Sequence, residues 1–364
     1  MIDRSIAGGE IMRYADANTT SGLFPIDEHV LEGDCILDSE NGAGYTMPMS
    51  KTNPLNNAIF QDASKARAWL ESLLWAGGRA CGYCGTLEAS SPLKGREGYY
   101  QCKACRKQFT VMVGTVFERS HIPLNKWLQA AFIMAASKKG MSAHQMSRML
   151  GITYKSTWFM CHRLREAMKA GNLPPLGGEG MVVEADETYF GELPAHKQPI
   201  RSNPKANRPK HGPTFKRAIV TLVERGGQAR SFYAETAKVE TVAKIVSENV
   251  AKETRLHTDT SSVYKNVGKE FAAHEAVNHG QKEYARGDVT TNTIEGFFSI
   301  FKRGMKGVYQ HCDERHLHRY LAEFGFRYNN RTALGVDDSE RTTNMLKGIS
   351  GKRLTYRRIN EREA

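Results

Sequence analysis

Apolar positions along the chain repeat with two different periods, and the change falls near residue 180. Before it, apolar residues recur every three or four positions, which predicts helices over 62–75, 121–140, 142–150 and 153–168. After it, short β-branched runs predict strands over 181–190, twice within 217–235, and over 254–260 and 271–279. Helical spacing returns in 238–252, 290–307 and 313–331. This order predicts a helical region followed by an α/β domain with a mixed sheet.

Cap and turn residues mark several of these boundaries. Asp62 is a good N-cap for the first helix, Pro123 suits the first turn of the second, and Gly140 suits its end. Gly226 and Gly227 are adjacent between two strand-like runs and predict a hairpin. The segment 169–180 has the Pro and Gly density of a linker. We therefore expect these parts: a poorly ordered leader 1–55, a helix with paired cysteines 56–118, a helical region 119–170, the α/β domain 171–335 and a C-terminal tail 336–364.

The composition indicates a polyanionic partner. The 364 residues are too many for one ordinary core, and 40% of them are apolar, which is normal for a soluble protein. The net charge of +12 favours a nucleic acid partner. No apolar run reaches eighteen residues, and the N-terminus lacks the apolar core of a signal peptide. We expect no membrane partner and a cytoplasmic location.

Four of the seven cysteines form two Cys-x-x-Cys pairs, Cys81 with Cys84 and Cys102 with Cys105. An odd number of cysteines in a cytoplasmic chain argues against a disulfide framework, and the spacing matches a four-cysteine Zn²⁺ site. Four thiolates leave no open coordination position, so this zinc is expected to be structural. Phe109 is expected to pack beneath it. The alternative is two redox pairs or buried small residues.

The segment 142–168 has the layout of a helix-turn-helix. Ser142 and Thr153 can cap two helices separated by Gly151. The expected inward positions are Ala143, Met146, Met149, Leu150, Trp158, Cys161 and Leu164. The expected outward positions are Tyr154, Lys155, Ser156, His162, Arg163 and Arg165. A polar and basic second helix is typical of a major-groove reader, so we assign DNA contacts to Lys155, Ser156, His162 and Arg163. An ordinary helical hairpin is the alternative.

A basic segment follows the first strand of the α/β domain. Between Leu193 and Arg217 there are seven Lys or Arg and no acid. Such a segment is either a solvated loop or a phosphate-contacting loop beside an active site, and both can hold. We assign DNA contacts here to Lys205, Arg208 and Lys210, and further ones to Lys302 and Arg303.

Acidic residues end two strands and begin one helix. Asp186 lies in "VEADETYF", Asp259 in "LHTDT", and Glu295 in the first turn of the helix over 290–307. Lys302 follows Glu295 by seven positions, nearly two turns, so both lie on the same side of the helix. Its apolar stripe, Ile294, Phe297, Phe298, Phe301 and Met305, can pack on the sheet.

Phosphodiester chemistry explains the use of such a set. Two divalent cations about 3.5–4 Å apart can stabilise both the attacking and the leaving oxygen. Carboxylates are ligands that Mg²⁺ prefers, and a nearby lysine can hold a DNA phosphate. We predict a Mg²⁺ (or Mn²⁺) site at Asp186, Asp259 and Glu295, with Lys302 beside it.

Each acid has an alternative interpretation. Asp186 and Asp259 could be ordinary turn residues. Glu184 and Glu187 are rival acids, and Glu184 is the stronger rival because it shares a strand face with Asp186. Asn292 could be the N-cap of the helix over 290–307, with Glu295 at its third helical position as part of a capping box.

Together these motifs resemble the DDE-class insertion-sequence transposases with a ribonuclease-H-like core. The resemblance runs from about residue 62 to 331 and rests on "CGYCG", "CKACRKQFTVMVGTVFE", "PLGGEGMVVEADETYFG", "LHTDTSSVYKNVG" and "TTNTIEGFFSIFKRGMKGVYQH". It is closest to the bacterial branch with an N-terminal zinc ribbon, which is related to the Merlin transposons. Residues 1–55 and about the last thirty lie outside it.

The resemblance implies a ribonuclease-H-like catalytic domain preceded by a small zinc ribbon and a helix-turn-helix region. It implies that Asp186, Asp259 and Glu295 bind the catalytic metal, with Lys302 as the associated basic residue. Some members carry Asn at the third position, so Asn292 competes with Glu295 for that role. The implied activity is binding of terminal inverted repeats, cleavage at the element end and joining of the 3′-hydroxyl to target DNA. A synaptic homodimer or higher assembly at the bacterial nucleoid is also implied.

Two other functions remain open at this stage. A metal-dependent nuclease or junction resolvase would share the acids without needing an end-binding module. A non-catalytic regulator would need only the ribbon and the helix-turn-helix. A decayed, inactive copy is a third possibility that one sequence leaves open.

Overall fold

The computed structural model describes residues 53–171, 173–193 and 215–355, all of which belong to one compact unit, Tyr45–Ala364. The predicted leader lies outside the described residues except for 53–55, which lead into a 3-10 turn, η1 (Pro54–Asn56). No helix in the described part of the chain is long and apolar enough to cross a membrane.

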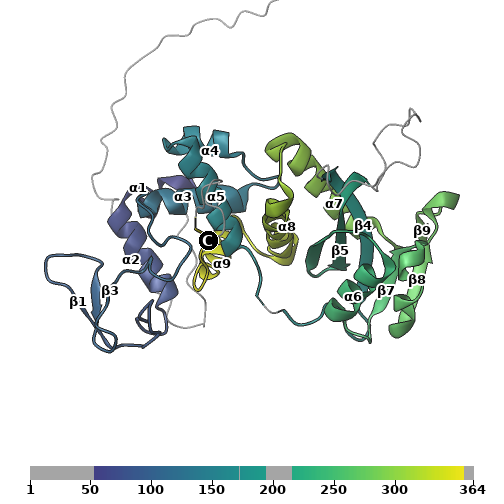
Figure 1. Ribbon diagram of the computed structural model, residues 1–364, viewed down its shortest axis with the longest axis horizontal. Helices are drawn as coiled ribbons and strands as arrows, with labels where there is room; N and C mark the ends of the chain where they lie inside the picture. The colour runs from purple at the N-terminus through teal and green to yellow at the C-terminus, as the bar shows by residue number, and fades with distance from the viewer. Residues whose placement is uncertain (1–52, 172, 194–214, 356–364) are drawn as a thin grey trace, which may run out of the picture. The chain divides into compact units, whose positions relative to one another are not determined.

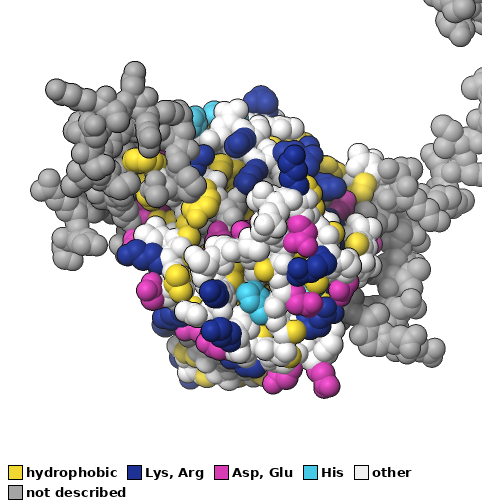
Figure 2. All heavy atoms as spheres, turned by 90° about the vertical axis from the view of Figure 1, so that its right-hand side faces the viewer, with side chains coloured by type: hydrophobic (Ala, Val, Ile, Leu, Met, Phe, Trp, Pro, Cys, Tyr) yellow, Lys and Arg dark blue, Asp and Glu magenta, His cyan; other side chains and the backbone are white. Residues whose placement is uncertain are grey.

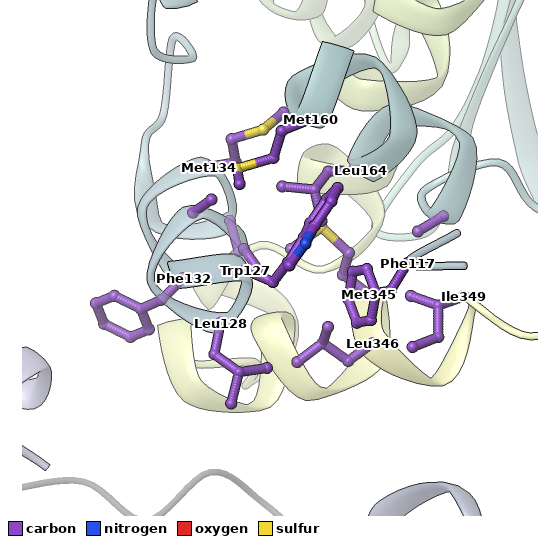
Figure 3. Packing of buried hydrophobic residues seen from close by; sticks show 14 of the residues in the cluster. Phe117, Trp127, Leu128, Phe132, Met134, Met160, Leu164, Met345, Leu346 and Ile349 are labelled. Carbon is purple, nitrogen blue, oxygen red and sulfur yellow. The ribbon is translucent and has the colours of Figure 1, made fainter. Parts of the chain in front are cut away.

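Helices from both ends of the described chain share one hydrophobic core. They are α1 (Ala58–Gln61), α2 (Ala63–Leu74), α3 (Leu124–Ala136), α4 (Ala143–Leu150), α5 (Tyr154–Ala167) and α9 (Asp338–Lys347). Figure 3 shows Trp127 of α3 among Phe117, Leu164 and Met345 in this core. The segment expected to be a tail thus contains a helix, α9, whose Met345 and Leu346 are fully buried. The apolar pattern of the sequence did not predict this helix.

Local capping in this region follows the sequence closely. The Asp62 carboxylate accepts hydrogen bonds from the backbone N–H groups of Ser64 and Lys65 at 2.6 and 3.0 Å, so the predicted N-cap of α2 is confirmed. Pro123 precedes α3 as its N-cap residue. The helix ends at Ala136, four residues before Gly140, so the predicted end was too late.

The two helices over 142–168 form with the predicted caps. Ser142 Oγ accepts from Gln145 N–H at 3.2 Å, Thr153 Oγ1 accepts from Ser156 N–H at 3.3 Å, and Gly151 ends α4 with φ +65°. Met149, expected to face inward, is 53% exposed. Only Met146 and Leu150 of α4 are buried, because its eight residues make little more than two turns.

Two side chains of α5 expected to face outward are buried. His162 is 1% exposed and Arg165 is 2% exposed. The reason is α8 (Glu314–Asn329), which packs along this side of α5: Arg165 Nε donates to Glu323 Oε2 at 2.7 Å, and His162 contacts the rings of His316 and Tyr320. Burial opposes ionisation of Glu323, but Arg327 and Arg165 together lower the pKa of its carboxyl to about 2. A buried ion pair therefore joins α5 to α8.

The α/β domain contains a five-stranded mixed sheet (Figure 1). Its strands are β4 (Val182–Glu192), β5 (Lys216–Glu224), β6 (Ala229–Ala234), β7 (Arg255–Asp259) and β8 (Ala273–Val277), in the order β6-β5-β4-β7-β8. β4, β5 and β6 pair antiparallel, whereas β4, β7 and β8 pair parallel. Gly226, with φ +72°, lies in the β5–β6 turn. The predicted strands, hairpin and mixed sheet are confirmed, and the arrangement is consistent with a ribonuclease-H-like fold.

Helices cover both faces of this sheet. α6 (Val239–Asn249) packs on one face through Val242 and Val246, against Ala185 and Leu222 of the strands. α7 (Asn292–Gly304) and α8 pack on the other face. The apolar stripe of α7 is buried as predicted, with Ile294, Phe297, Phe298, Phe301 and Met305 all at most 5% exposed. A two-stranded ribbon, β9 (Ala285–Arg286) and β10 (Val289–Thr290), leads into α7.

Replacing Leu346 by Ala should lower the free energy of unfolding by about 2–5 kcal/mol, because it leaves a cavity between α9 and α3. Denaturant titration measures this loss. Met149→Ala is the control. Because Met149 is 53% exposed in the same helical region, this variant should lower the free energy of unfolding by no more than about 0.5 kcal/mol. Equal losses in both variants would contradict the burial of α9.

Candidate zinc site and candidate active site

The four paired cysteines come together in one small module. It contains β1 (Ser90–Pro92), β2 (Tyr100–Cys102) and β3 (Gln108–Phe109), which pair antiparallel. One thiol sulfur from each of the four residues lies within 4.8 Å of all the others, and the Sγ–Sγ distances of Cys81–Cys105 and Cys84–Cys102 are both 3.7 Å. A zinc ion bound at about 2.3 Å to four thiolates needs Sγ–Sγ separations of roughly 3.8 Å. The donor set and its spacing therefore fit a closed, structural Zn²⁺ site.

The two Cys-x-x-Cys turns have the same backbone geometry. Gly85 N–H donates to the Cys81 carbonyl at 2.9 Å, and Arg106 N–H donates to the Cys102 carbonyl at 3.1 Å. Gly85 has φ +72° and Arg106 has φ +61°, the left-handed region in both cases. Arg106 adopts it despite its side chain, which indicates that the turn geometry outweighs the local steric cost.

A small aromatic core supports these turns. Phe109 is 1% exposed and lies against Tyr100 and Trp75, with ring centroids 5.8 and 6.1 Å away. The predicted packing of Phe109 under the cysteines is confirmed. Trp75 closes α2, so the module is attached to the helix that precedes it.

Asp186 and Asp259 lie side by side on neighbouring strands. Glu184 of β4 is level with His257 of β7, and because the pairing is parallel, Asp186 is level with Asp259 two residues further on. β7 ends at Asp259, whereas β4 continues to Glu192. The Asp259 carboxylate also accepts from Ser261 N–H at 2.9 Å. Two carboxylates therefore meet where one strand ends beside a longer one.

Glu187 joins these two acids. Carboxylate oxygens of Asp186, Glu187 and Asp259 all lie within 4.8 Å of one another. Strand alternation predicts that Glu184, which shares a strand face with Asp186, is a stronger candidate for the acidic cluster than Glu187. This prediction is wrong, because Glu187 and not Glu184 belongs to the cluster. Glu184 is fully buried against α7, whereas Glu187 lies past the end of β7 and can reach the edge from the other face. Strand alternation alone does not show where a neighbouring strand stops, so sequence reasoning ranked Glu187 below Glu184.

The carboxyls of this cluster are hard to ionise together. Burial raises the pKa of Asp186 to about 7, with further increases from Asp259 and Glu295 and a partial offset from Lys302. Burial and the charges of Asp186 and Asp259 likewise raise the pKa of Glu187 to about 7. Neighbouring negative charges in a half-buried site favour protonation unless a cation compensates them. The cluster thus has the electrostatic character of a cation site.

Glu295 and Lys302 lie on α7, near this cluster. The charges of both influence the Asp186 carboxyl, although Glu295 is not within the closely spaced group of three. Glu295 is exposed, and its Oε1 lies 3.6 Å from His279 Nε2, whose ring nitrogen also lies 3.1 Å from Thr291 Oγ1. Lys302 Nζ lies 5.8 Å from the ring centroid of Phe298. His279 was not among the predicted site residues.

The start of α7 differs from the predicted capping box. Its N-cap residue is Thr291, not Asn292, and no side chain of its own caps it. Asn292 is the first helical residue and is exposed, so Glu295 is the fourth helical residue rather than the third. The reason is that a carboxylate from the sheet occupies the capping position: Glu184 Oε2 accepts from Ile294 N–H at 2.9 Å.

The predicted DNA contacts fall into three groups. Lys155, Arg303 and, less fully, Ser156, Arg163 and Lys302 are exposed in the structure. His162 is buried against α8, so its side chain cannot reach DNA in this arrangement, and that assignment is wrong. Lys205, Arg208 and Lys210 lie outside the described residues. Figure 2 shows one face on which Lys and Arg side chains alternate with acidic ones rather than forming a single basic field.

Comparisons with known proteins agree with both modules. The ISXO2-like transposase domain matches residues 175–329, and the transposase zinc-ribbon domain matches residues 62–108. The chain is 28% identical over 282 residues to an uncharacterized protein in the transposable element ISH50 of Halobacterium salinarum, over 74% of this chain and 91% of that relative.

Among solved structures, one chain of the simian T-cell lymphotropic virus intasome in complex with PP2A regulatory subunit B56 gamma is matched with a TM-score of 0.26 and 10% identity, over 50% of this chain and 63% of that chain. A likeness this weak carries no argument.

The α/β domain is a DDE transposase domain, and the four-cysteine module is a transposase zinc ribbon. Together the two matched segments cover more than half of the chain. The two domains and the relative from a transposable element therefore support an insertion-sequence transposase of the DDE class with an N-terminal zinc ribbon. The bacterial branch stays a prediction.

Purified protein should contain one zinc per chain, measured by elemental analysis, and Cys102→Ser should lose it because three thiolates no longer close the tetrahedron. Cys312→Ser is the matched control, since Cys312 lies outside the cluster and should leave the zinc content unchanged. Full zinc content in Cys102→Ser would contradict the site.

Binding of Mn²⁺ to the zinc-loaded protein should release protons. The pKa values of Asp186 and Glu187 are raised to about 7. In the metal-free protein both carboxyls therefore stay largely protonated up to nearly pH 7, well above the pH at which ordinary carboxyls ionise. A cation requires the ionised forms, so its affinity should rise as pH increases through 7 and level off above it.

Calorimetry in buffers of different ionisation enthalpy measures the release: about one proton at pH 7 and close to none at pH 8.5. Glu187→Gln should reduce the release at pH 7. An affinity that does not change between pH 6 and pH 8.5 would contradict the raised pKa values.

Proposed function

We propose that this transposase binds the terminal inverted repeats of its element, cleaves the element ends, and joins the freed 3′-hydroxyl to target DNA. The observation that carries this proposal is the pairing of β4 with β7, which brings Asp186 level with Asp259 beside the α7 helix. A regulator that only binds DNA has no use for buried, mutually repelling carboxylates.

Asp186 and Asp259 would hold the divalent cations, Mg²⁺ or Mn²⁺, with Glu295 as the third ligand. The fit rests on the carboxylate oxygens of Asp186, Glu187 and Asp259, which lie within 4.8 Å of one another in a site where burial raises the carboxyl pKa values, and on the charge of Glu295, which acts on Asp186 from α7. When bound, the cations stabilise the attacking and leaving oxygens of the phosphodiester. Glu187 lies close enough to add a fourth carboxylate or to orient a bound water.

Lys302 has a separate role in this proposal. It lies on the same helix as Glu295 and lowers the pKa of Asp186, so its charge acts at the cluster. An ammonium group there can hold a non-bridging phosphate oxygen of the scissile strand. Since α7 is anchored by a buried apolar stripe, both side chains are presented by one rigid element.

Binding of the element ends is assigned to the zinc ribbon and the α4–α5 pair. Both carry exposed aromatic residues next to basic ones. Lys107 Nζ lies 4.9 Å from the ring centroid of Tyr83, which is 51% exposed, and Tyr154 stacks on His144 at 3.9 Å next to Lys155. Such pairs suit contacts with phosphates and sugars. The proposed contacts remain Lys155, Ser156, Arg163, Lys302 and Arg303, together with Lys205, Arg208 and Lys210 outside the described residues. The protein would act as a homodimer or higher assembly that holds two ends.

A strand-transfer assay with labelled element ends tests the chemistry. Asp186→Asn and Asp259→Asn should abolish cleavage and joining, while binding of the ends stays within about twofold of the wild type, because the acids are proposed to act on the metal and not on DNA affinity. Activity should require added Mg²⁺ or Mn²⁺. Full activity in either variant would sink the mechanism, and cleavage without any joining would favour a nuclease.

The third active-site residue is tested in the same assay. Glu295→Gln should be inactive and Asn292→Ala active, because the charge of Glu295 raises the pKa of Asp186, whereas Asn292 carries no charge. The reverse result would assign the role to Asn292.

A further inference from the structure

One buried carboxylate of β4 does not face the acidic cluster. Glu184 lies two residues before Asp186, and its side chain is 0% exposed. A carboxylate in such a place is costly unless its oxygens are hydrogen-bonded and its charge is paired. Both conditions are met by Ile294 of α7 and by Arg225, which follows β5.

Each oxygen of Glu184 has its own partner. Oε2 accepts from the backbone N–H of Ile294, in the first turn of α7, at 2.9 Å. Oε1 accepts from Arg225 Nε at 2.8 Å. The first turn of any helix leaves its N–H groups without partners inside the helix, and the N-cap residue of α7, Thr291, makes no side-chain cap. The nearby Thr290 Oγ1 accepts from Asn292 N–H at 3.5 Å, which leaves the Ile294 N–H to Glu184. A strand residue therefore does what a local N-cap does elsewhere.

Arg225 extends the same contact to the segment before α7. Its guanidinium donates to the carbonyl of Asp288 at 2.6 Å and, through Nη2, to the carbonyl and the hydroxyl of Thr290 at 2.9 and 3.0 Å. Its own backbone N–H donates to the Val182 carbonyl of β4 at 3.0 Å. Arg225 thus joins the β9–β10 ribbon, the start of α7 and the central strand.

The hydrogen bond between Glu184 and Ile294 lies directly beside Glu295, the proposed third metal ligand. Glu295 follows Ile294 directly, and its backbone N–H donates to the Thr291 carbonyl at 3.0 Å. Glu295 comes from a different element than Asp186 and Asp259, so its distance from them depends on how the first turn of α7 sits on the sheet. A displacement of about 1 Å in a catalytic site can cost roughly 100-fold in rate.

We propose that Glu184, held by Arg225, is a positioning residue that fixes the first turn of α7 on β4 and thereby places Glu295 beside Asp186 and Asp259. The proposal rests on the proposed function for its catalytic consequence, but the contact itself can be tested without activity. Glu184 touches neither DNA nor metal in this role.

The test compares four variants of the full-length protein. Glu184→Ala removes both contacts of the carboxylate. Glu184→Gln keeps an oxygen that can accept from Ile294 N–H and loses the charge. Arg225→Lys keeps the charge of Arg225 and loses its fork of donors. Val246→Ala is the stability control, because Val246 of α6 is fully buried on the opposite face of the sheet.

Hydrogen exchange followed by mass spectrometry is the first readout. In Glu184→Ala, peptides that cover 291–297 should exchange roughly 10-fold faster than in the wild type, which corresponds to one lost hydrogen bond. Peptides from α6 should be unchanged. Glu184→Gln should stay close to the wild type, and Val246→Ala should change α6 without a selective change at 291–297.

The second readout is cleavage of labelled element ends at saturating DNA. Glu184→Ala and Arg225→Lys should lower kcat by roughly 10- to 100-fold and raise the half-saturating Mg²⁺ concentration, with KM for DNA within about twofold. Glu184→Gln should recover most of the rate. Val246→Ala should lose activity only in proportion to its unfolded fraction, with unchanged Mg²⁺ demand.

The outcomes separate the two proposals. Unchanged exchange at 291–297 in Glu184→Ala overturns the positioning role, whatever the activity. So does a Glu184→Ala protein whose kcat and Mg²⁺ demand match those of Val246→Ala at equal stability. Absence of cleavage by the wild type with Mg²⁺ or Mn²⁺ would instead reject the proposed function, and the exchange data would then decide the structural contact alone.

Discussion

Parallel pairing of β4 with β7 places Asp186 level with Asp259. The surrounding elements of the α/β domain hold these two strands in place or carry charges that act on the two carboxylates. Two carboxylates side by side in a half-buried site repel each other, and burial and repulsion together raise the pKa of Asp186 to about 7. The arrangement is stable because the sheet is held from both faces by α6 and by α7 with α8. The strain that remains is electrostatic, and a cation would relieve it.

Ion pairs with a fully buried carboxylate connect the elements around this contact. Arg165 and Glu323 join α5 to α8, and Arg225 and Glu184 join the sheet to α7. Ion pairs in such positions contribute little net stability compared with apolar packing, but removing one partner leaves an uncompensated charge. They therefore suit places where the relative position of two elements matters more than the total free energy of unfolding. Both pairs link segments far apart in sequence.

The zinc ribbon follows a different principle. Its strands are two or three residues long, and its core consists of Trp75, Tyr100 and Phe109 around the cysteines. Such a core is too small to be stable alone, so a zinc ion bound by the four cysteines would supply the missing stability. The clustering of the four cysteines and the packing of Phe109 were predictable from spacing, because each Cys-x-x-Cys turn sets the position of its own two sulfurs; the contacts of Trp75 and Tyr100 were not predicted.

Periodicity, caps and spacing by themselves predicted the cluster of four cysteines, the strands, most helices and the buried stripe of α7, because each depends largely on contacts between residues a few positions apart. They also placed Asp259 at a strand end, which is confirmed, whereas the predicted strand end at Asp186 is wrong because β4 continues to Glu192. Only the tertiary structure decided that Glu187, not Glu184, joins them, since this depends on where β7 stops beside β4. It likewise buried His162 and Arg165 under α8, drew α9 into the helical core, and gave the cap of α7 to a residue 110 positions away. The physical reason is the same in each case: a side chain's exposure and partners are set by the element packed against it, and that element lies too far along the chain for any local pattern to reveal.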